Sequence, residues 1–369
     1  MADLLIFLEA PNRGVRLAVC MAPLLAREAA RRHGLAEGSA AALAQGLTGS
    51  LLLAATDRPE RPEEARVDVQ LECRGPLRGL LVDADGGGSV RGLVRVNVLD
   101  RLGARTDTGT GGPARPGGLE GASYAGASAG PGLQLAVPPS VASAAAVFPP
   151  DLVSLFQPLA RGPASTPHRF DARALLGGGS DEQAGVLSIL RATPGADPLH
   201  RATVPFAGGD LAAGLSAFLR SDRLLPGELS LEVLFGRVEP LAAVGGALIL
   251  PATEEEKELA RALGDRLREG ELHRALLEVE ASTPGNAHAL AQGLATRLEL
   301  GPLRVLGELR PRFACRCSRE RVVRALQTMG AEELLRMAAE DGGAEATCDF
   351  CAQTYRIGAQ ELIELISVG

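Results

Sequence analysis

Near its end the chain reads Phe313-Ala-Cys-Arg-Cys-Ser318 and, further on, Thr347-Cys-Asp-Phe-Cys351. Four of the six cysteines therefore stand in the last 55 residues, as a CxC pair and a CxxC pair with 30 residues between them. Four thiols in two tight pairs can surround one soft cation in the tetrahedral sulfur site that zinc prefers. Each pair can also form its own disulfide if the metal leaves. The spacing therefore predicts both a structural metal site and a potential redox switch.

The segment around these cysteines reads as a small module with little core. Ser318 is a good N-cap for a helix to Met329, and a second helix is expected over 331–340. Residues 344–348 and 353–357 read as a hairpin with the CxxC at its tip, before a closing helix over 359–366. A turn of this kind aims both sulfurs at one point. Because so short a segment buries little apolar surface, metal binding would supply much of its folding free energy.

Three other interpretations of the cysteines are weaker. Buried structural cysteines are common, but four in two close pairs are improbable by chance. A thioredoxin-type site needs its CxxC at the start of a helix that follows a strand, whereas this CxxC lies between two predicted strands. A zinc module that binds nucleic acid is the serious rival. Residues 311–369 hold seven Arg and nine Asp or Glu with no basic stripe, which disfavours that rival.

Composition and charge narrow the class of protein. The 369 residues carry a formal net charge of −7, which disfavours a general attraction to nucleic acid or anionic lipid. No run of 18 apolar residues occurs, so a membrane span is not expected. The N-terminus shows no basic segment and no A-x-A cleavage site, so no signal peptide is expected. Paired cysteines without an export signal indicate reduced thiols in the cytoplasm rather than a secreted disulfide framework.

Residues 1–250 predict an α/β core domain. Strands are expected over 4–9, 15–20, 66–73, 79–84 and 90–96, with helices over 22–32 and 39–55. Further strands are expected over 186–192, 202–206, 229–234 and 241–250, with a helix over 211–220. The stretch from about 101 to 184 is rich in Gly, Ala and Pro and shows no such pattern. Its first part, about 103–132, is therefore predicted to be a flexible excursion from the core domain.

The character of the chain changes at Thr253, which has the form of a helix N-cap before three glutamates. One helix is expected from there to about Leu277, with leucines at every fourth position from Leu259 and a heavily charged opposite face. A shorter helix is expected over 286–298. So charged a segment is a poor candidate for a core domain of its own. Residues 251–310 therefore predict a helical linker that docks weakly.

No arrangement of side chains in the sequence predicts catalysis. Cys20 and Cys73 lie on expected strands, where cysteine usually behaves as a small apolar residue. Asp83 and Asp85 end a strand at a turn, where aspartates usually form the turn itself. The histidines show no ligand spacing with one another or with the cysteines: His33, His168, His200, His273 and His288. The chain is therefore predicted not to be an enzyme. A third hypothesis, an enzyme in the core domain, has no support beyond the α/β fold class of that domain.

The segment with the cysteines also resembles a known family. The matching stretches are Phe313 to Val322, Met329 to Leu334 and Glu340 to Cys351, and their order with these neighbours is highly specific. Further matches are Arg31-Arg-His-Gly-Leu35, Gly75-Pro-Leu-Arg-Gly-Leu-Leu-Val-Asp83 and Val90-Arg-Gly92, with a looser match over 202–250. Together they cover most of the chain outside roughly 101–184. In these places the chain is similar to the redox-regulated 33-kilodalton heat-shock chaperones of the bacterial cytoplasm.

The resemblance implies an α+β fold in three parts. These are an N-terminal α/β core domain with mixed sheets (1–250), a metastable helical linker (251–310) and a small zinc module (311–369). The stretch at about 101–184 is longer and richer in Gly, Ala and Pro than the family pattern, so it is interpreted as an insertion. The resemblance also implies a homodimer in the active state, often formed by exchange of elements.

The resemblance assigns roles to the four clustered cysteines. Carried over by motif, Cys315, Cys317, Cys348 and Cys351 would bind Zn²⁺ in the reduced protein. Oxidants such as hypochlorite, or peroxide with heat, would form the disulfides Cys315–Cys317 and Cys348–Cys351 and release the metal, so that module and linker unfold. The exposed apolar surface would then hold unfolding client proteins without ATP. The first hypothesis is thus a redox-gated holdase that protects against aggregation, and the alternative is a zinc-module regulator that binds nucleic acid.

Overall fold

The structure is a computed structural model that describes residues 2–54, 64–98, 168–177, 183–192, 200–221, 226–236 and 239–368. These residues form two compact units. Unit 1 holds the described residues of 1–103 and 156–315 together with Asp349–Cys351, and unit 2 holds 316–348 and 352–368. Most of the predicted insertion at 101–184 lies outside the described residues. The predicted division at residues 250 and 310 stays a prediction.

Unit 1 contains two six-stranded sheets, and the first has the strand order β11-β1-β2-β10-β9-β6. Each strand runs antiparallel to its neighbours: β1 (Leu4–Ala10), β2 (Val15–Met21), β6 (His168–Arg169), β9 (Glu228–Phe235), β10 (Leu241–Pro251) and β11 (Arg304–Leu309). β10 is buried along almost its whole length, as its continuous apolar run predicts.

The second sheet has the order β12-β5-β4-β3-β7-β8. Its strands are β3 (Arg66–Cys73), β4 (Gly79–Asp85), β5 (Ser89–Val94), β7 (Gln183–Ala192), β8 (His200–Ala207) and β12 (Arg312–Phe313). β12 runs parallel to β5, and the other neighbours are antiparallel. The two sheets and their helices confirm the predicted α+β class with mixed sheets.

Helices fill the space between the two sheets: α1 (Pro23–His33), α2 (Glu37–Ala54), α5 (Arg173–Leu176) and α6 (Leu211–Ser221). α2 is buried from Gly38 to Ala54, as a helix that is apolar on all sides should be. It contacts strands of both sheets, among them β10 and β4. These helices and the inner faces of the sheets make up the main hydrophobic core of unit 1.

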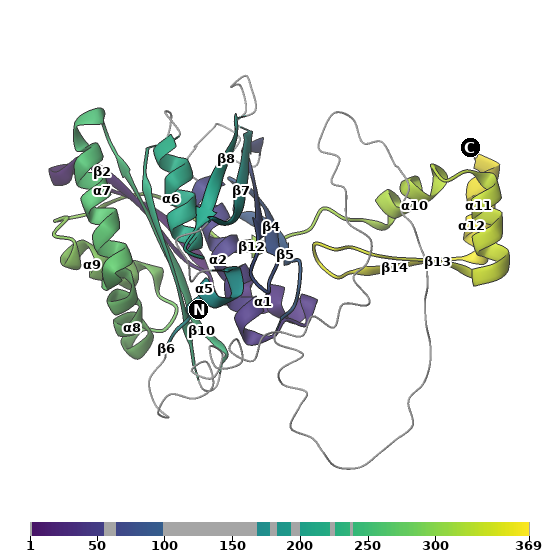
Figure 1. The fold of residues 1–369 in the computed structure, drawn as a ribbon, viewed down its shortest axis with the longest axis horizontal. Coiled ribbons are helices and arrows are strands. Elements are labelled where there is room, and N and C mark those ends of the chain that lie inside the picture. The colour runs from purple at the N-terminus through teal and green to yellow at the C-terminus, as the bar shows by residue number, and fades with distance from the viewer. Residues whose placement is uncertain are drawn as a thin grey trace, which may run out of the picture. The chain divides into compact units, whose positions relative to one another are not determined.

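Three further helices cover the other face of the first sheet: α7 (Lys257–Arg266), α8 (Leu272–Ser282) and α9 (Ala287–Arg297). Figure 1 shows them on the side of β10 that faces away from α2. Each helix contributes a leucine that is at most 4% exposed and packs against the outer face of the sheet: Leu263, Leu276 and Leu294. The segment predicted as a linker is thus folded onto unit 1 through a continuous apolar face.

The expected single helix from Thr253 to about Leu277 is wrong in its continuity. Thr253 does cap the first turn, because its hydroxyl accepts a hydrogen bond from Glu255 N. After α7, however, the backbone leaves helical geometry at Gly270, where φ is 124°. Glycine adopts this conformation without the steric penalty that other residues pay. The chain therefore bends there, and α8 starts at Leu272.

Unit 2 contains α10 (Arg319–Gln327), α11 (Ala331–Arg336), β13 (Gly343–Thr347), β14 (Thr354–Gly358) and α12 (Ala359–Val368). α11 continues into one π-helical turn that ends at Asp341. The Ser318 hydroxyl accepts a hydrogen bond from Arg321 N, which confirms the predicted N-cap of α10. The buried core of unit 2 is small and consists of Leu326, Leu334, Ile357 and Leu362.

Three strands of unit 1 were not predicted from the sequence: β6, β11 and β12. β11 pairs with β1 and β12 pairs with β5, so both find their partners in a distant, earlier part of the chain. β12 has two residues and offers no periodic pattern. Among the described helices, none has the length and apolarity that crossing a membrane requires.

Candidate metal centre

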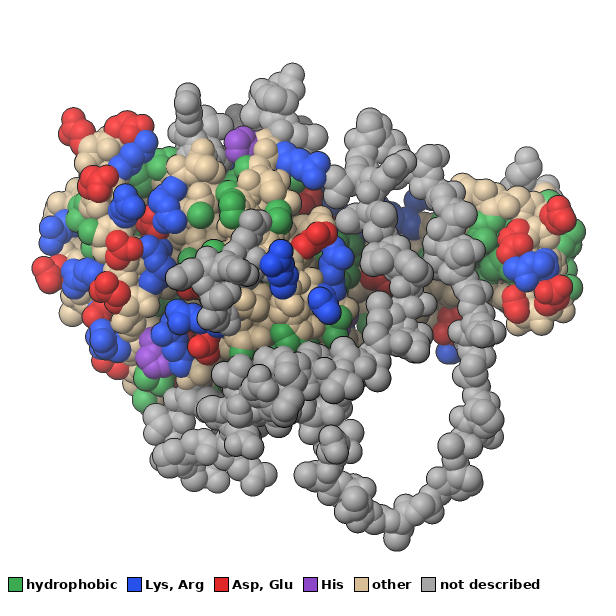
Figure 2. Space-filling view, viewed as in Figure 1, with side chains coloured by type: hydrophobic (Ala, Val, Ile, Leu, Met, Phe, Trp, Pro, Cys, Tyr) green, Lys and Arg blue, Asp and Glu red, His purple; other side chains and the backbone are tan. Residues whose placement is uncertain are grey.

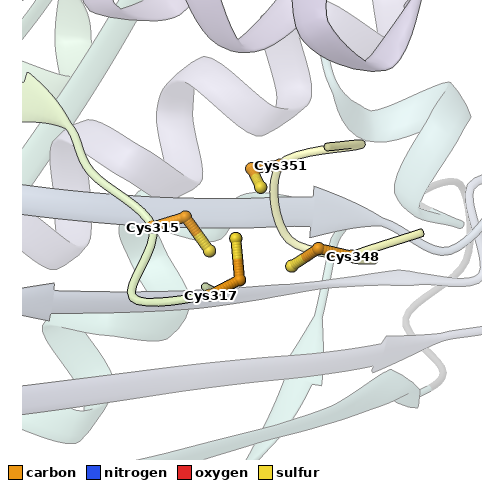
Figure 3. A group of neighbouring side chains, drawn as sticks. All are labelled: Cys315, Cys317, Cys348 and Cys351. Atoms are coloured by element: carbon orange, nitrogen blue, oxygen red, sulfur yellow. The ribbon is translucent and has the colours of Figure 1, made fainter. Parts of the chain in front are cut away.

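The four cysteines of the two motifs come together at one place. The Sγ atoms of Cys315, Cys317, Cys348 and Cys351 all lie within 4.8 Å of one another. Figure 3 shows the CxC pair on one loop and the CxxC pair on another, with the sulfurs turned toward each other. None of the four forms a disulfide in this structure. Among the described residues, no other group of three or more His, Cys, Asp or Glu side chains is close enough to hold a metal ion.

The CxC pair follows a strand that is anchored on the second sheet. Arg312 N donates to Gly88 O at 2.9 Å, and Ala314 N donates to Val90 O at 2.9 Å. These hydrogen bonds hold β12 beside β5 up to the residue before Cys315. The backbone that leads to Cys315 is therefore held in place by hydrogen bonds within unit 1.

The CxxC pair lies at the tip of the β13–β14 hairpin, as predicted. Cys348 N donates to Gln353 O at 2.9 Å, and Ala352 N donates to Cys348 O at 2.8 Å. Ala352 has a φ of 57°, in the left-handed region, which closes the turn after Cys351. Cys351 itself is only 3% exposed. The turn thus brings two sulfurs from four consecutive residues to the same site.

Three side chains outside the cysteine motifs contact this site, and sequence reasoning missed all of them. The Tyr355 hydroxyl donates to Cys317 Sγ at 3.1 Å. Arg91 Nη1 lies 3.6 Å from Cys315 Sγ as a hydrogen-bond donor. His33 Nε2 lies 3.1 Å from the carbonyl oxygen of Phe350. Arg91 and His33 do fall in stretches that carry the family resemblance. That resemblance was the one feature of the sequence that could have pointed to these two residues.

The other two cysteines stay apart from the cluster. Cys20 is fully buried and Cys73 is 8% exposed, both in the core between the sheets. Burial raises the pKa of both thiols, so neither is a reactive thiolate at neutral pH. The interpretation of both as core residues is confirmed.

The two aspartates play different parts. Asp85 forms the predicted turn, because its Oδ1 accepts hydrogen bonds from Gly87 N and Ser89 N. Asp83 does not belong to the turn, so that part of the prediction is wrong. It faces Arg91 across β4 and β5, and both Arg91 Nε and Nη2 lie 2.8 Å from its Oδ2. The alternation of strand residues turns Asp83 and Asp85 to the same face, but only the pairing of β4 with β5 selects the partner.

The donor set of the cluster fits a soft divalent cation. Four thiolates around zinc, with metal–sulfur bonds of about 2.3 Å in a tetrahedron, stand about 3.8 Å apart. The limit of 4.8 Å on the sulfur separations is compatible with such an arrangement. Four sulfurs with no carboxylate among them favour zinc over the hard cations magnesium and calcium. The cluster could therefore bind a metal.

Comparison with known proteins gives relatives over nearly the whole chain. The 33 kDa chaperonin of Acaryochloris marina is 28% identical over 368 residues, which cover 99% of this chain and 97% of that protein. The 33 kDa chaperonin of Synechocystis sp. is 29% identical, with 99% and 96% covered. The crystal structure of the 33 kDa chaperonin from Thermotoga maritima superposes with a TM-score of 0.60 at 18% identity, covering 100% of this chain and 99% of that one. The fold is therefore shared across the full length.

The family model described as Hsp33 protein matches residues 3–358. A match of that extent, together with relatives aligned from end to end, settles the family on sequence as well as on fold. Its members are chaperones rather than enzymes, so the predicted class of protein is confirmed, and client proteins are the partners that this class implies. The chain belongs to the Hsp33 family of 33 kDa chaperonins.

Proposed function

We propose that the protein is a redox-regulated, ATP-independent holdase chaperone of the cytoplasm. In the reduced state Cys315, Cys317, Cys348 and Cys351 hold Zn²⁺, and the protein is inactive. Oxidation of these cysteines activates it. The single observation that carries the proposal is that two close cysteine pairs, from two separate segments, converge on one site.

The four side chains have two alternative states. When bound, zinc keeps the sulfurs as thiolates and joins the CxC segment to the CxxC hairpin. Without the metal, each pair is close enough in sequence to form a disulfide within its own loop, Cys315–Cys317 and Cys348–Cys351. Such disulfides close only very short loops, so they do not connect the two segments to each other.

The oxidation step balances with peroxide as the two-electron oxidant. For each disulfide, one thiolate attacks a peroxide oxygen and breaks the O–O bond, and the second thiolate then displaces the sulfenic oxygen. Two electrons leave the sulfurs, and two protons complete two molecules of water. Two such steps consume all four thiolates, so no metal ligand remains in the cluster.

Loss of the metal ligands weakens unit 2 and then the helices of unit 1 that precede the cluster. Unit 2 has a buried core of only four apolar side chains, which is too little for a stable fold without a metal. The chain from α9 reaches Cys315 through β11 and β12. When this end loosens, α7–α9 leave the first sheet and expose the apolar surfaces that they bury. Those surfaces bind unfolding clients, and the active form is a homodimer.

The charge pattern gives no support to nucleic-acid binding. Figure 2 shows acidic and basic side chains interspersed over α7–α9 on the visible face, rather than gathered into a basic stripe. The net charge of −7 also disfavours binding to nucleic acid, because the phosphate groups of nucleic acid are negative too.

Zinc content, free thiols and suppression of client aggregation measured on the same sample test the proposal. The reduced protein should hold one zinc per chain, retain all four cluster thiols, and leave clients to aggregate. Peroxide with mild heat should release the zinc, remove four thiols and start the holdase activity, with a rise in apparent mass if the dimer forms.

Cys315→Ser should hold zinc weakly and be partly active without oxidant, whereas Cys73→Ala should behave like the wild type. Equal activity of the zinc-loaded reduced protein and the oxidised protein would rule the switch out.

A further inference from the structure

Arg91 lies in the second sheet, and its guanidinium contacts three side chains: Asp83, Cys315 and Phe350. It stands on β5 directly opposite Asp83 on β4. Both Nε and Nη2 lie 2.8 Å from Asp83 Oδ2, and Asp83 is only 7% exposed. A guanidinium held in this way by a buried carboxylate has a fixed plane and a fixed direction for its remaining N–H groups.

Those remaining groups point at the cysteine cluster. Arg91 Nη1 donates toward Cys315 Sγ at 3.6 Å. The Arg91 Cζ atom lies 4.3 Å from the centroid of the Phe350 ring, which is the cation–π arrangement. Phe350 stands between the two cysteines of the CxxC motif, so one guanidinium contacts both segments that supply sulfurs.

A second contact holds the same loop to unit 1. His33, the last residue of α1, lies with its Nε2 3.1 Å from the carbonyl oxygen of Phe350. The CxxC loop is therefore held by its backbone and by the ring of Phe350, and both partners belong to unit 1. Cys315 and Asp349–Cys351, which belong to unit 1, are thus held by side chains of the same unit, and Arg91 contacts both segments.

We propose that Arg91 is a positioning residue for the cysteine cluster, which holds Cys315 and the CxxC loop against the second sheet and compensates the negative charge of four metal-bound thiolates. This proposal rests on the proposed function. A zinc ion with four thiolates carries a net charge of −2, and a cation that donates to one sulfur stabilises that state. A hydrogen-bonded, charge-compensated thiolate is also a weaker nucleophile toward peroxide. Arg91 therefore sets both the metal affinity and the dose of oxidant at which the thiols react.

The test must separate this role from a simple ion pair within the sheet. Arg91→Gln alone would leave Asp83 buried without its cation, which destabilises the sheet for an unrelated reason. The double variant Asp83→Asn/Arg91→Gln replaces the ion pair with two amides, so that no charge is left buried without a partner, and removes the charged contacts to the cluster. Arg95 and Glu72 form another ion pair of this sheet, at 2.9 Å, so Glu72→Gln/Arg95→Gln is the matched control.

Zinc affinity is measured by competition with a chelator, and thiol loss is followed over time in dilute peroxide, both on the full chain. The Asp83→Asn/Arg91→Gln variant should bind zinc 10- to 100-fold more weakly and lose its thiols several-fold faster than the wild type, with an unchanged circular dichroism spectrum. Arg91→Lys, which keeps the charge but not the planar fork, should fall between the two. The control pair should match the wild type in both measurements.

Two outcomes would overturn the proposal. The first is wild-type zinc affinity and oxidation rate in the Asp83→Asn/Arg91→Gln variant. The second is an equal change in the Glu72→Gln/Arg95→Gln control, which would mean that any lost ion pair of the sheet acts on the cluster. If the Asp83→Asn/Arg91→Gln chain does not fold, Phe350→Leu removes the ring contact alone and should still weaken zinc binding; no change there would also overturn it. A wild type that binds no zinc would instead refute the proposed function.

Discussion

The cysteines of the cluster and those of the core lie in different surroundings. Cys315 and Cys317 receive N–H and O–H donors from Arg91 and Tyr355. Burial among apolar side chains raises the pKa of Cys20, which keeps it as a thiol. A side-chain donor to a sulfur stabilises the negative charge that the sulfur carries when it binds a metal.

Tyr355→Phe tests the contribution of a single donor at the residue scale. The change removes only the hydroxyl that donates to Cys317 Sγ at 3.1 Å, so zinc affinity should fall about tenfold while the ring keeps its packing. Chelator competition measures the effect. Thr354→Val, on the same hairpin, removes the hydroxyl contact with Thr347 instead and should leave zinc affinity unchanged. Equal affinities of Tyr355→Phe and the wild type would show that this donor is dispensable.

How far the sequence reveals the site also depends on the residue. The CxC and CxxC spacings identify all four clustered cysteines, because ligands for one ion must be close in space and short spacings ensure that within each pair. Arg91 could not be found in this way, since it lies far from Cys315 in the chain and meets it only after β12 pairs with β5. Asp83 was misread for the same reason: its partner is set by sheet register.

At the scale of elements, α7 approaches the first sheet more closely than a side chain would allow. A Cβ atom on Gly264 would stand 2.2 Å from the Cβ atom of Glu228 on β9. Glu228 is 3% exposed and pairs with Arg268, just beyond α7, at 2.7 Å. Glycine at this position lets the helix reach the buried carboxylate that its own end neutralises.

Gly264→Ala should therefore loosen α7. The added methyl group cannot be accommodated without separating the helix from β9, at a cost of about 1–3 kcal/mol in the free energy of unfolding. The reduced protein should become more sensitive to protease in 257–282 and partly active as a holdase. Gly293→Ala is the matched control, because its Cβ would meet Ala275 at an ordinary 3.8 Å. That change should stabilise α9 by about 0.5–1 kcal/mol, and identical behaviour of the two variants would contradict the explanation.

Docking of α8 should also depend on pH through Glu232. Burial is the main cause that raises the pKa of this carboxyl from 4.5 to about 7, and Asp210 adds to it while Arg169 opposes it. Its Oε1 lies 3.5 Å from Nδ1 of His273 on α8, and burial lowers the pKa of that imidazole, so neither group carries its charge easily.

The direction of the pH effect follows from the raised pKa. Below about pH 4.5 the carboxyl is neutral in the folded and unfolded chains, so its burial has no extra cost. As the pH rises to about 7, the carboxyl ionises in the unfolded chain before it does so in the folded one, so the free energy of unfolding declines. Above pH 7 the carboxyl is ionised in both states, and the free energy of unfolding declines no further on its account. Glu232→Gln should therefore raise the stability at pH 8 by an amount on the order of 2 kcal/mol, with little effect at pH 4.5. Thermal unfolding at several pH values measures this, and a gain independent of pH would contradict it.

Most elements follow from local patterns, and each exception has a physical cause. The period of apolar residues predicts α2, β10 and the β13–β14 hairpin close to their observed bounds. The bend at Gly270 escaped prediction because the leucine period continues across it, and one glycine inside a helical pattern is often tolerated. β11 escaped because an edge strand with exposed residues is defined by its partner β1, not by its own sequence.

At the scale of the whole molecule, the two units differ greatly in the means that stabilise them. Unit 1 has two hydrophobic cores, one between its sheets and one beneath α7–α9. Unit 2 has four buried apolar side chains and several exposed ion pairs, such as Arg336 with Glu333, which add little. The stability of unit 2 therefore depends on the cysteine cluster in a way that the stability of unit 1 does not.

Removal of zinc from the reduced protein by a strong chelator should unfold unit 2 and leave the main core of unit 1 intact. Hydrogen exchange followed by mass spectrometry should show lost protection over 316–348 and 352–368, while α2, which is buried from Gly38 to Ala54, stays protected. Added zinc should restore protection, because reduced thiols can rebind it. In the peroxide-treated protein the loss should extend to α7–α9 and persist when zinc is added, until a reductant restores the thiols. Full protection of unit 2 after zinc removal would mean that its small core suffices and that the metal is not its main source of stability.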